Sequence, residues 1–125
     1  MEKLEAFKNG SLNILVATDL AARGLDIADV KTVINFSMPM TYKHYIHRVG
    51  RTARAKNSGR SISLVAESDR WLLKEIIKSS KEPVKSRVIP PEVIEFYRQK
   101  CDEIREKVTE KLNEEKEEKI MDKME

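Results

Sequence analysis

Two arginines three residues apart, Arg51 and Arg54, close the octapeptide His47-Arg48-Val49-Gly50-Arg51-Thr52-Ala53-Arg54. The segment reads as helical, and residues three apart share one helical face, so both guanidinium groups can reach one small anion. Two such cations can stabilise the charge that develops on a transferring phosphoryl group. A bare Arg-x-x-Arg is more often a solvated basic helix face or a general nucleic-acid patch, so this interpretation needs support from elsewhere in the chain.

A second motif upstream provides that support: Ala17-Thr18-Asp19-Leu20-Ala21-Ala22-Arg23-Gly24-Leu25-Asp26 follows a short apolar run. Such a run is typical of a strand buried on both faces, and it places Thr18 and Asp19 at the carboxyl end, where parallel sheets bind ligands. Gly24 permits a close backbone approach, and Asp26 can accept hydrogen bonds from a ribose. Thr18 or Asp19 can also cap the short helix that follows, whose amino terminus can itself bind a phosphate.

Residues 17–26 resemble motif V, and residues 47–54 resemble motif VI, of the DEAD-box RNA helicases of superfamily 2. Residues 4–10 resemble the family's helix before motif V, and residues 59–63 its strand after motif VI. One departure is Ala53, where many members have glycine. A methyl group there is expected to be tolerated if the backbone is helical.

The resemblance implies an α/β fold with a RecA-like parallel sheet flanked by helices, and the alternation of expected strands and helices agrees with it. We expect the second RecA-like domain, without its first strands, over residues 1–80. A linker at 81–91 and a charged helical extension with a frayed end at 92–125 then follow. No Gly-x-x-x-x-Gly-Lys-Ser/Thr loop and no Asp-Glu-Ala-Asp occurs in the sequence. In the family these bind ATP and Mg²⁺ on the first RecA-like domain. The chain is therefore expected to be the C-terminal part of an RNA helicase, an ATP hydrolase, and to be inactive alone.

The resemblance implies that one group of residues contacts the nucleotide. ATP would lie between the two RecA-like domains, with Arg51 and Arg54 at its γ-phosphate and His47 linking motif VI to the acidic motif of the first domain. The ribose contacts would come from Asp26 and Gly24.

The resemblance also implies contacts that do not involve the nucleotide. Thr18 and Asp19 would meet the RNA backbone independently of base sequence, and Arg23 and Arg48 would lie at the interdomain surface. In the family, these contacts serve to unwind short RNA duplexes or to remodel RNA–protein complexes.

The net charge of +3 conceals an asymmetry. Residues 1–90 hold 16 lysines and arginines against 9 acidic residues, whereas residues 91–125 hold 8 against 12. A basic body suits a polyanionic partner and predicts RNA binding that weakens as salt rises. The single cysteine, Cys101, excludes an internal disulfide and fits a reducing, intracellular compartment. No apolar run is long enough to suggest a membrane partner, and two histidines without clustered cysteines argue against a zinc site.

The expected helices cover 2–8, 41–50 and 69–79, the expected strands cover 13–17, 32–36 and 61–65, and a helical turn covers 20–23. Ser68 is the expected cap of the third helix, which should pack on the sheet through Trp71, Leu72, Ile76 and Ile77. In the final helix, apolar residues recur at steps of three and four and include Tyr97, Cys101, Ile104, Val108 and Leu112. This face can pack on the domain or on a partner, and the stripe is too short to favour a coiled coil.

Residues 85–91 and the Glu/Lys-rich helix resemble a nucleolar branch of the family that acts in assembly of the large ribosomal subunit. This resemblance implies a nuclear, nucleolar location, a role in pre-rRNA processing and pre-ribosomal protein partners. Two other classes stay open. The first is a catalytically inactive RNA- or helicase-binding module. The second is a DNA-directed helicase, whose motif VI tends to begin with glutamine rather than His47-Arg48.

Overall fold

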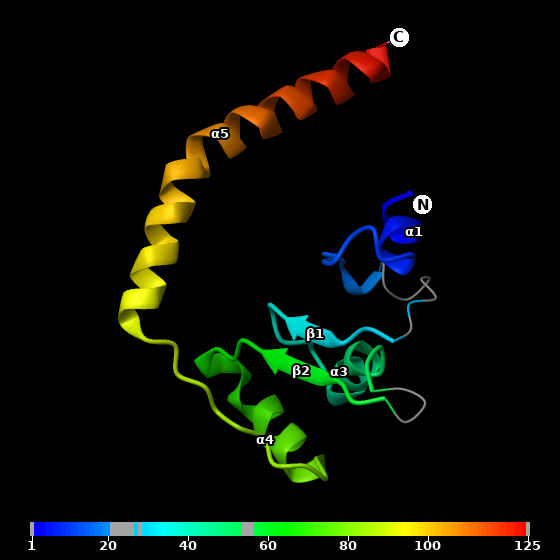
Figure 1. Cartoon of the computed structure of the whole chain (residues 1–125), viewed down its shortest axis with the longest axis vertical. Coiled ribbons are helices and arrows are strands. Elements are labelled where there is room, and N and C mark those ends of the chain that lie inside the picture. Colours follow the sequence, from blue (N-terminus) through cyan, green and yellow to red (C-terminus); the bar gives the residue numbers. More distant parts are fainter. Residues whose placement is uncertain (1, 21–26, 28, 54–56, 125) are drawn as a thin grey trace. The chain divides into compact units, whose positions relative to one another are not determined.

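The computed structural model describes residues 2–20, 27, 29–53 and 57–124. The chain divides into two compact units, Met1–Val84 and Lys85–Glu125. The first unit holds α1 (Glu2–Lys8), β1 (Thr32–Asn35), α3 (Tyr42–Val49), β2 (Arg60–Ser63), the 3₁₀ turn η1 (Glu67–Asp69) and α4 (Arg70–Ser79) (Figure 1). The second unit holds α5 (Pro91–Met124).

The two strands run parallel, with Thr32 opposite Arg60 and Asn35 opposite Ser63. The helix α3 lies between them in sequence and packs against β1 and α4. Parallel strands require a crossover connection, which a helix supplies. This pairing confirms the expected α/β parallel arrangement.

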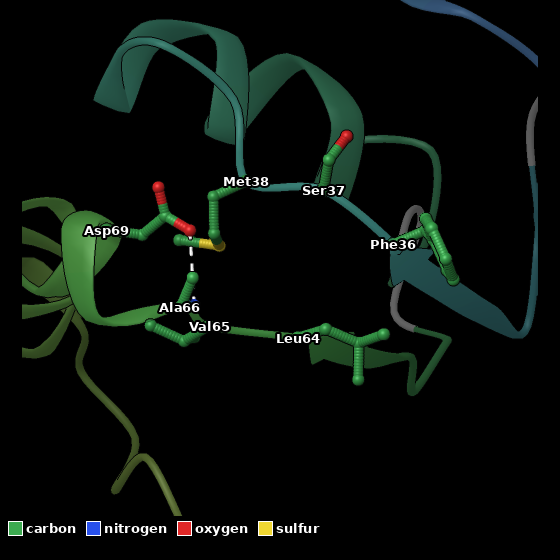
Figure 2. Close-up of a pocket in the computed structure, with 7 residues that line it drawn as sticks. All are labelled: Phe36, Ser37, Met38, Leu64, Val65, Ala66 and Asp69. Carbon is green, nitrogen blue, oxygen red and sulfur yellow. Dashed lines mark hydrogen bonds between the residues drawn. The ribbon is translucent and has the colours of Figure 1, made fainter.

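The helix α3 begins where its sequence predicts, because the Thr41 hydroxyl accepts a hydrogen bond from the His44 amide at 3.2 Å. The expected cap of α4 is wrong. This helix begins at Arg70 after η1, and the Asp69 carboxylate, rather than Ser68, is engaged, accepting from the Ala66 amide at 3.2 Å (Figure 2). This carboxylate bond lies at the start of η1, and the side chain of Asp69, the N-cap residue of α4, makes no capping bond to that helix.

The core of the first unit is small, and α4 contributes Leu72 and Ile76 to it. These two are four residues apart and therefore lie on one stripe. The expectation that Trp71 and Ile77 also pack on the sheet is wrong, because they flank this stripe and are 56% and 51% exposed.

The expected strand at 13–17 is not formed. Ile14 and Val16 are 80% and 92% exposed, and the sheet within the described residues consists of β1 and β2 alone. A strand is defined by its hydrogen-bonded neighbour, so an apolar run without one remains irregular.

The helix α5 is continuous, and Pro91 occupies its first position, where a missing amide hydrogen costs nothing. Within the described part of the chain, no helix combines the length and the apolar character needed to cross a membrane.

Candidate functional site

Arg48 connects motif V to motif VI. Its Nε donates to Oδ1 of Asp19 at 2.6 Å and its Nη2 donates to Oδ2 at 2.7 Å, which makes a bidentate ion pair across 29 residues of sequence. The Arg48 side chain is 22% exposed and that of Asp19 is 46% exposed. A fork-to-carboxylate pair fixes orientation as well as distance, so it sets where the motif V segment lies relative to α3.

The remaining Arg48 nitrogen extends the network to β1. Its Nη1 donates to the Ser37 carbonyl at 2.7 Å and approaches Oδ1 of Asn35 at 3.4 Å. Asn35 is 2% exposed, and its Nδ2 donates to the Ser63 hydroxyl of β2 at 3.0 Å. The guanidinium therefore joins motif V, both strands and α3. Sequence reasoning missed Asn35, although a polar residue ending the apolar run of a strand is a signal of a buried hydrogen-bonded position.

In residues 47–53, the described part of the octapeptide, the helix does not continue past Val49, so the expected helical course there is wrong. The helix α3 ends at Val49, and the Gly50 amide donates to the Ile46 carbonyl at 2.8 Å. Arg51 and Thr52 then form tighter turns, their amides donating to the carbonyls three residues earlier. Ala53 has a φ of +54°, which ends the right-handed course of the backbone.

The Arg51 carbonyl accepts a hydrogen bond from the Val30 amide at 3.1 Å. This bond places the motif VI turn beside the segment that enters β1, shortly after Asp26. Arg51 itself is half-buried, and His47, in the last turn of α3, is exposed. Thr18 and Asp19 are also exposed. Four predicted site residues lie outside the described residues, namely Arg23, Gly24, Asp26 and Arg54.

Ala53 occupies a conformation that glycine adopts more readily. The expectation that a methyl group is tolerated on a helical backbone does not apply, because the backbone there is left-handed. The neighbouring loop is also tight. A Cβ on Gly59 would overlap the Thr52 hydroxyl. Thr52 is 7% exposed, and its hydroxyl has no hydrogen-bond partner among the described residues.

We expect Ala53→Gly to raise the stability of the first unit by about 1 kcal/mol, because it removes the left-handed penalty on a side chain. Urea unfolding followed by fluorescence of Trp71, the single tryptophan, measures the first unit selectively. The matched control is Ala66→Gly, at a residue with a φ of −82°. There glycine gains nothing in the folded state and adds entropy to the unfolded chain, so a stabilisation equal to that of Ala53→Gly would contradict the assignment.

Two surface hollows border these elements. One, of about 440 Å³, lies at the carboxyl ends of β1 and β2 and is lined by Phe36, Ser37, Met38, Leu64, Val65, Ala66 and Asp69 (Figure 2). It is largely apolar, and the Ser37 carbonyl and Asp69 carboxylate already accept hydrogen bonds. The other, of about 780 Å³, lies at the amino ends of the strands beside Ala53 and includes Lys31 and Arg60. In the described ranges, no three His, Cys, Asp or Glu side chains are grouped to hold a metal ion.

Residues 1–56 match the helicase conserved C-terminal domain. The chain is 56% identical over 121 residues to the probable ATP-dependent RNA helicase DDX27 of Homo sapiens, covering 97% of this chain and 16% of that protein. It is 48% identical over 122 residues to the ATP-dependent RNA helicase DRS1 of Mycosarcoma maydis, covering 97% of this chain and 13% of that protein. The chain thus spans about a sixth or less of the length of these relatives.

Two solved structures resemble the structure of this chain. The E. coli DEAD-box protein SrmB, bound to regulator of ribonuclease activity A, aligns with a TM-score of 0.61 at 50% identity, over 70% of this chain and 52% of that one. The yeast DEAD-box splicing factor Prp28 aligns with a TM-score of 0.59 at 36% identity, over 78% of this chain and 22% of that one. With both motifs present and linked through Asp19 and Arg48, the chain belongs to the DEAD-box RNA helicase family, as part of its helicase C-terminal domain followed by a helical extension.

Proposed function

We propose that this chain supplies the second RecA-like half of an ATP-dependent RNA helicase, with motif VI acting on ATP and motif V on RNA. The observation that carries the proposal is the bidentate pair between Asp19 and Arg48, which holds the two motifs on one scaffold. A helicase needs such a connection, because closure of its two domains on ATP must change how the protein binds RNA.

On the nucleotide side, Arg51 and Arg54 are proposed to act as arginine fingers at the γ-phosphate, with His47 contacting the first domain and Asp26 and Gly24 the ribose. The hydrogen bond between the Arg51 carbonyl and the Val30 amide supports this division, since it brings the motif VI turn beside the segment following Asp26. ATP carries Mg²⁺, whose ligands we assign to the first domain.

On the RNA side, we propose that the exposed Thr18 contacts the RNA backbone, and that Asp19 positions the protein segment that carries Thr18. Both Asp19 oxygens bind Arg48, so that pair acts inside the unit and holds the motif V segment in place. Of the two expected interdomain arginines, Arg23 remains the proposed interdomain cation, whereas the Arg48 side chain is bound within the unit by Asp19 and Ser37. Contacts of this kind go to phosphates and 2′-hydroxyls and carry little sequence preference.

The biological setting is proposed to be large-subunit ribosome assembly, with pre-rRNA as substrate and pre-ribosomal proteins as partners in the nucleolus. Similarity to DDX27 and DRS1 over 97% of the chain, including the region after residue 84, supports this branch of the family.

The test compares ATP hydrolysis by the 125-residue chain with hydrolysis by a protein that also carries the family's ATP-binding first domain. We expect RNA-stimulated hydrolysis in the longer protein only, and no stimulation by DNA. If DNA stimulates equally, the chain belongs with DNA-directed helicases. If the longer protein binds RNA without hydrolysing ATP, the chain acts as a binding module instead.

A further inference from the structure

The helix α5 carries an apolar stripe of residues at steps of three and four, which therefore lie on one face. We call this set the α5 stripe; it consists of Ile94, Tyr97, Cys101, Ile104, Val108 and Leu112. Its members are exposed, at 45% for Ile94, 62% for Tyr97 and 54% for Ile104. After Leu112 the same face carries Glu115, Lys119 and Asp122, so the stripe is about 27 Å long.

Cations border the α5 stripe on both sides. At 100° per residue, Arg98 and Arg105 follow one edge, and Lys100, Lys107 and Lys111 follow the other. The opposite face of the same turns is acidic and carries Glu95, Asp102, Glu103, Glu106 and Glu110. Residues 94–112 hold five basic and five acidic residues, and this balance conceals a separation of the two charges by face.

Three of the bordering cations form weak local ion pairs, and Lys100 also lies 5.7 Å from the centre of the Phe96 ring. Arg105 binds Asp102 at 2.8 Å, Arg98 binds Glu95 at 3.1 Å, and Lys100 lies 3.5 Å from Glu103, each three residues away. All these side chains are at least 54% exposed. Exposed pairs of this kind contribute little to stability, so carboxylates from a partner can replace them.

The basic borders of the α5 stripe favour some binding partners over others. A second copy of this helix would bring basic border against basic border whether the two helices ran parallel or antiparallel, which disfavours a homodimer. RNA would find one exposed ring in the α5 stripe, that of Tyr97. The rest of its apolar surface, at Ile104, Val108 and Leu112, is aliphatic and offers neither rings for base stacking nor hydrogen-bond donors. An amphipathic helix bordered by acidic side chains satisfies both the apolar centre and the basic borders.

We propose that residues 94–112 of α5 bind an amphipathic helix of a partner protein whose apolar stripe is bordered by aspartate and glutamate. The proposal stands independently of ATP hydrolysis and RNA unwinding. It gives the extension after the helicase domain a specific role, the recruitment of an acidic helical partner.

Two designed peptides of about four heptads test the proposal. Both carry leucine at the core positions, one with glutamate and the other with lysine at every flanking position. Binding of the labelled peptides to the 125-residue chain is followed by fluorescence anisotropy. We expect the acidic-flanked peptide to bind at least about tenfold tighter than the basic-flanked one, because several flanking pairs change from attraction to repulsion. The difference should shrink as salt rises.

Variants locate the binding surface. Arg98→Glu with Arg105→Glu makes one border acidic and leaves the lysine border intact, so it should reduce the preference for the acidic-flanked peptide severalfold. Ile104→Asp should abolish binding while circular dichroism shows the helix retained. The matched control, Lys116→Glu with Lys119→Glu, makes the same change in net charge on the same helix beyond the α5 stripe and should leave the preference unchanged.

Three results would overturn the proposal. The first is equal binding of the two peptides. The second is concentration-dependent self-association through Ile104 without peptide binding. The third is binding of a single-stranded RNA oligonucleotide that Arg98→Glu with Arg105→Glu abolishes while neither peptide binds.

Discussion

Replacing Arg51 by alanine in the complete helicase is expected to reduce RNA-stimulated ATP hydrolysis by about 10³- to 10⁵-fold, the range associated with an arginine finger. RNA affinity should change little, because the proposed RNA contacts come from motif V. The fold should also survive. The structural bond of this residue is made by its main-chain carbonyl to the Val30 amide, which alanine retains.

Two further variants sharpen this result. Arg51→Lys keeps the positive charge but loses the planar fork, so it should recover only a small part of the rate. Arg70→Ala removes an exposed arginine of α4 that pairs with Glu67 at 3.1 Å, and it should leave hydrolysis unchanged. Steady-state ATP hydrolysis with and without RNA, together with RNA binding by anisotropy, separates the effects. Equal loss of hydrolysis and RNA binding in a folded Arg51→Ala protein would refute the division of roles.

The parts of the fold that follow from local chemistry could be predicted from the sequence. The helices expected at 2–8 and 41–50 depend on residues close in sequence, and the structure has them at Glu2–Lys8 and Tyr42–Val49. The parallel pairing of β1 and β2 follows from the helix between them.

The predictions are wrong where residues distant in sequence, or a single backbone angle, determine the local structure. Residues 13–17 read as a strand, but a strand requires a hydrogen-bonded neighbour that spacing does not reveal. Residues 47–53 read as helical, but Gly50 ends α3 and Ala53 turns left-handed. The partners of Arg48 lie 11, 13 and 29 residues away, so no periodicity could indicate them.

Replacing Arg48 by alanine is expected to destabilise the first unit by about 2 kcal/mol, because it leaves the Asp19 carboxylate and the Ser37 carbonyl without their charged donor. We use a value below that of a fully buried pair, since Asp19 is 46% exposed. Urea unfolding followed by Trp71 fluorescence measures the change, and Arg70→Ala, which breaks an exposed pair, is the control with almost no expected effect.

A double-mutant cycle with Asp19→Ala and Arg48→Ala isolates the pair, and we expect a coupling of about 1 to 2 kcal/mol. Arg48→Lys should recover less than half of the loss, because an ammonium group cannot make the bidentate pair and reach Ser37 together.

In the complete helicase, Arg48→Ala should lower RNA binding and ATP hydrolysis together, since the pair holds the motif V segment to the helix that ends in motif VI. Arg51→Ala should separate these two activities, and this contrast distinguishes a residue that positions both motifs from one that acts on the nucleotide. Additive effects in the cycle would show that Asp19 and Arg48 are not coupled. An Arg48→Ala protein that loses hydrolysis but keeps RNA binding would show that Arg48 acts at the nucleotide rather than as the link between the motifs.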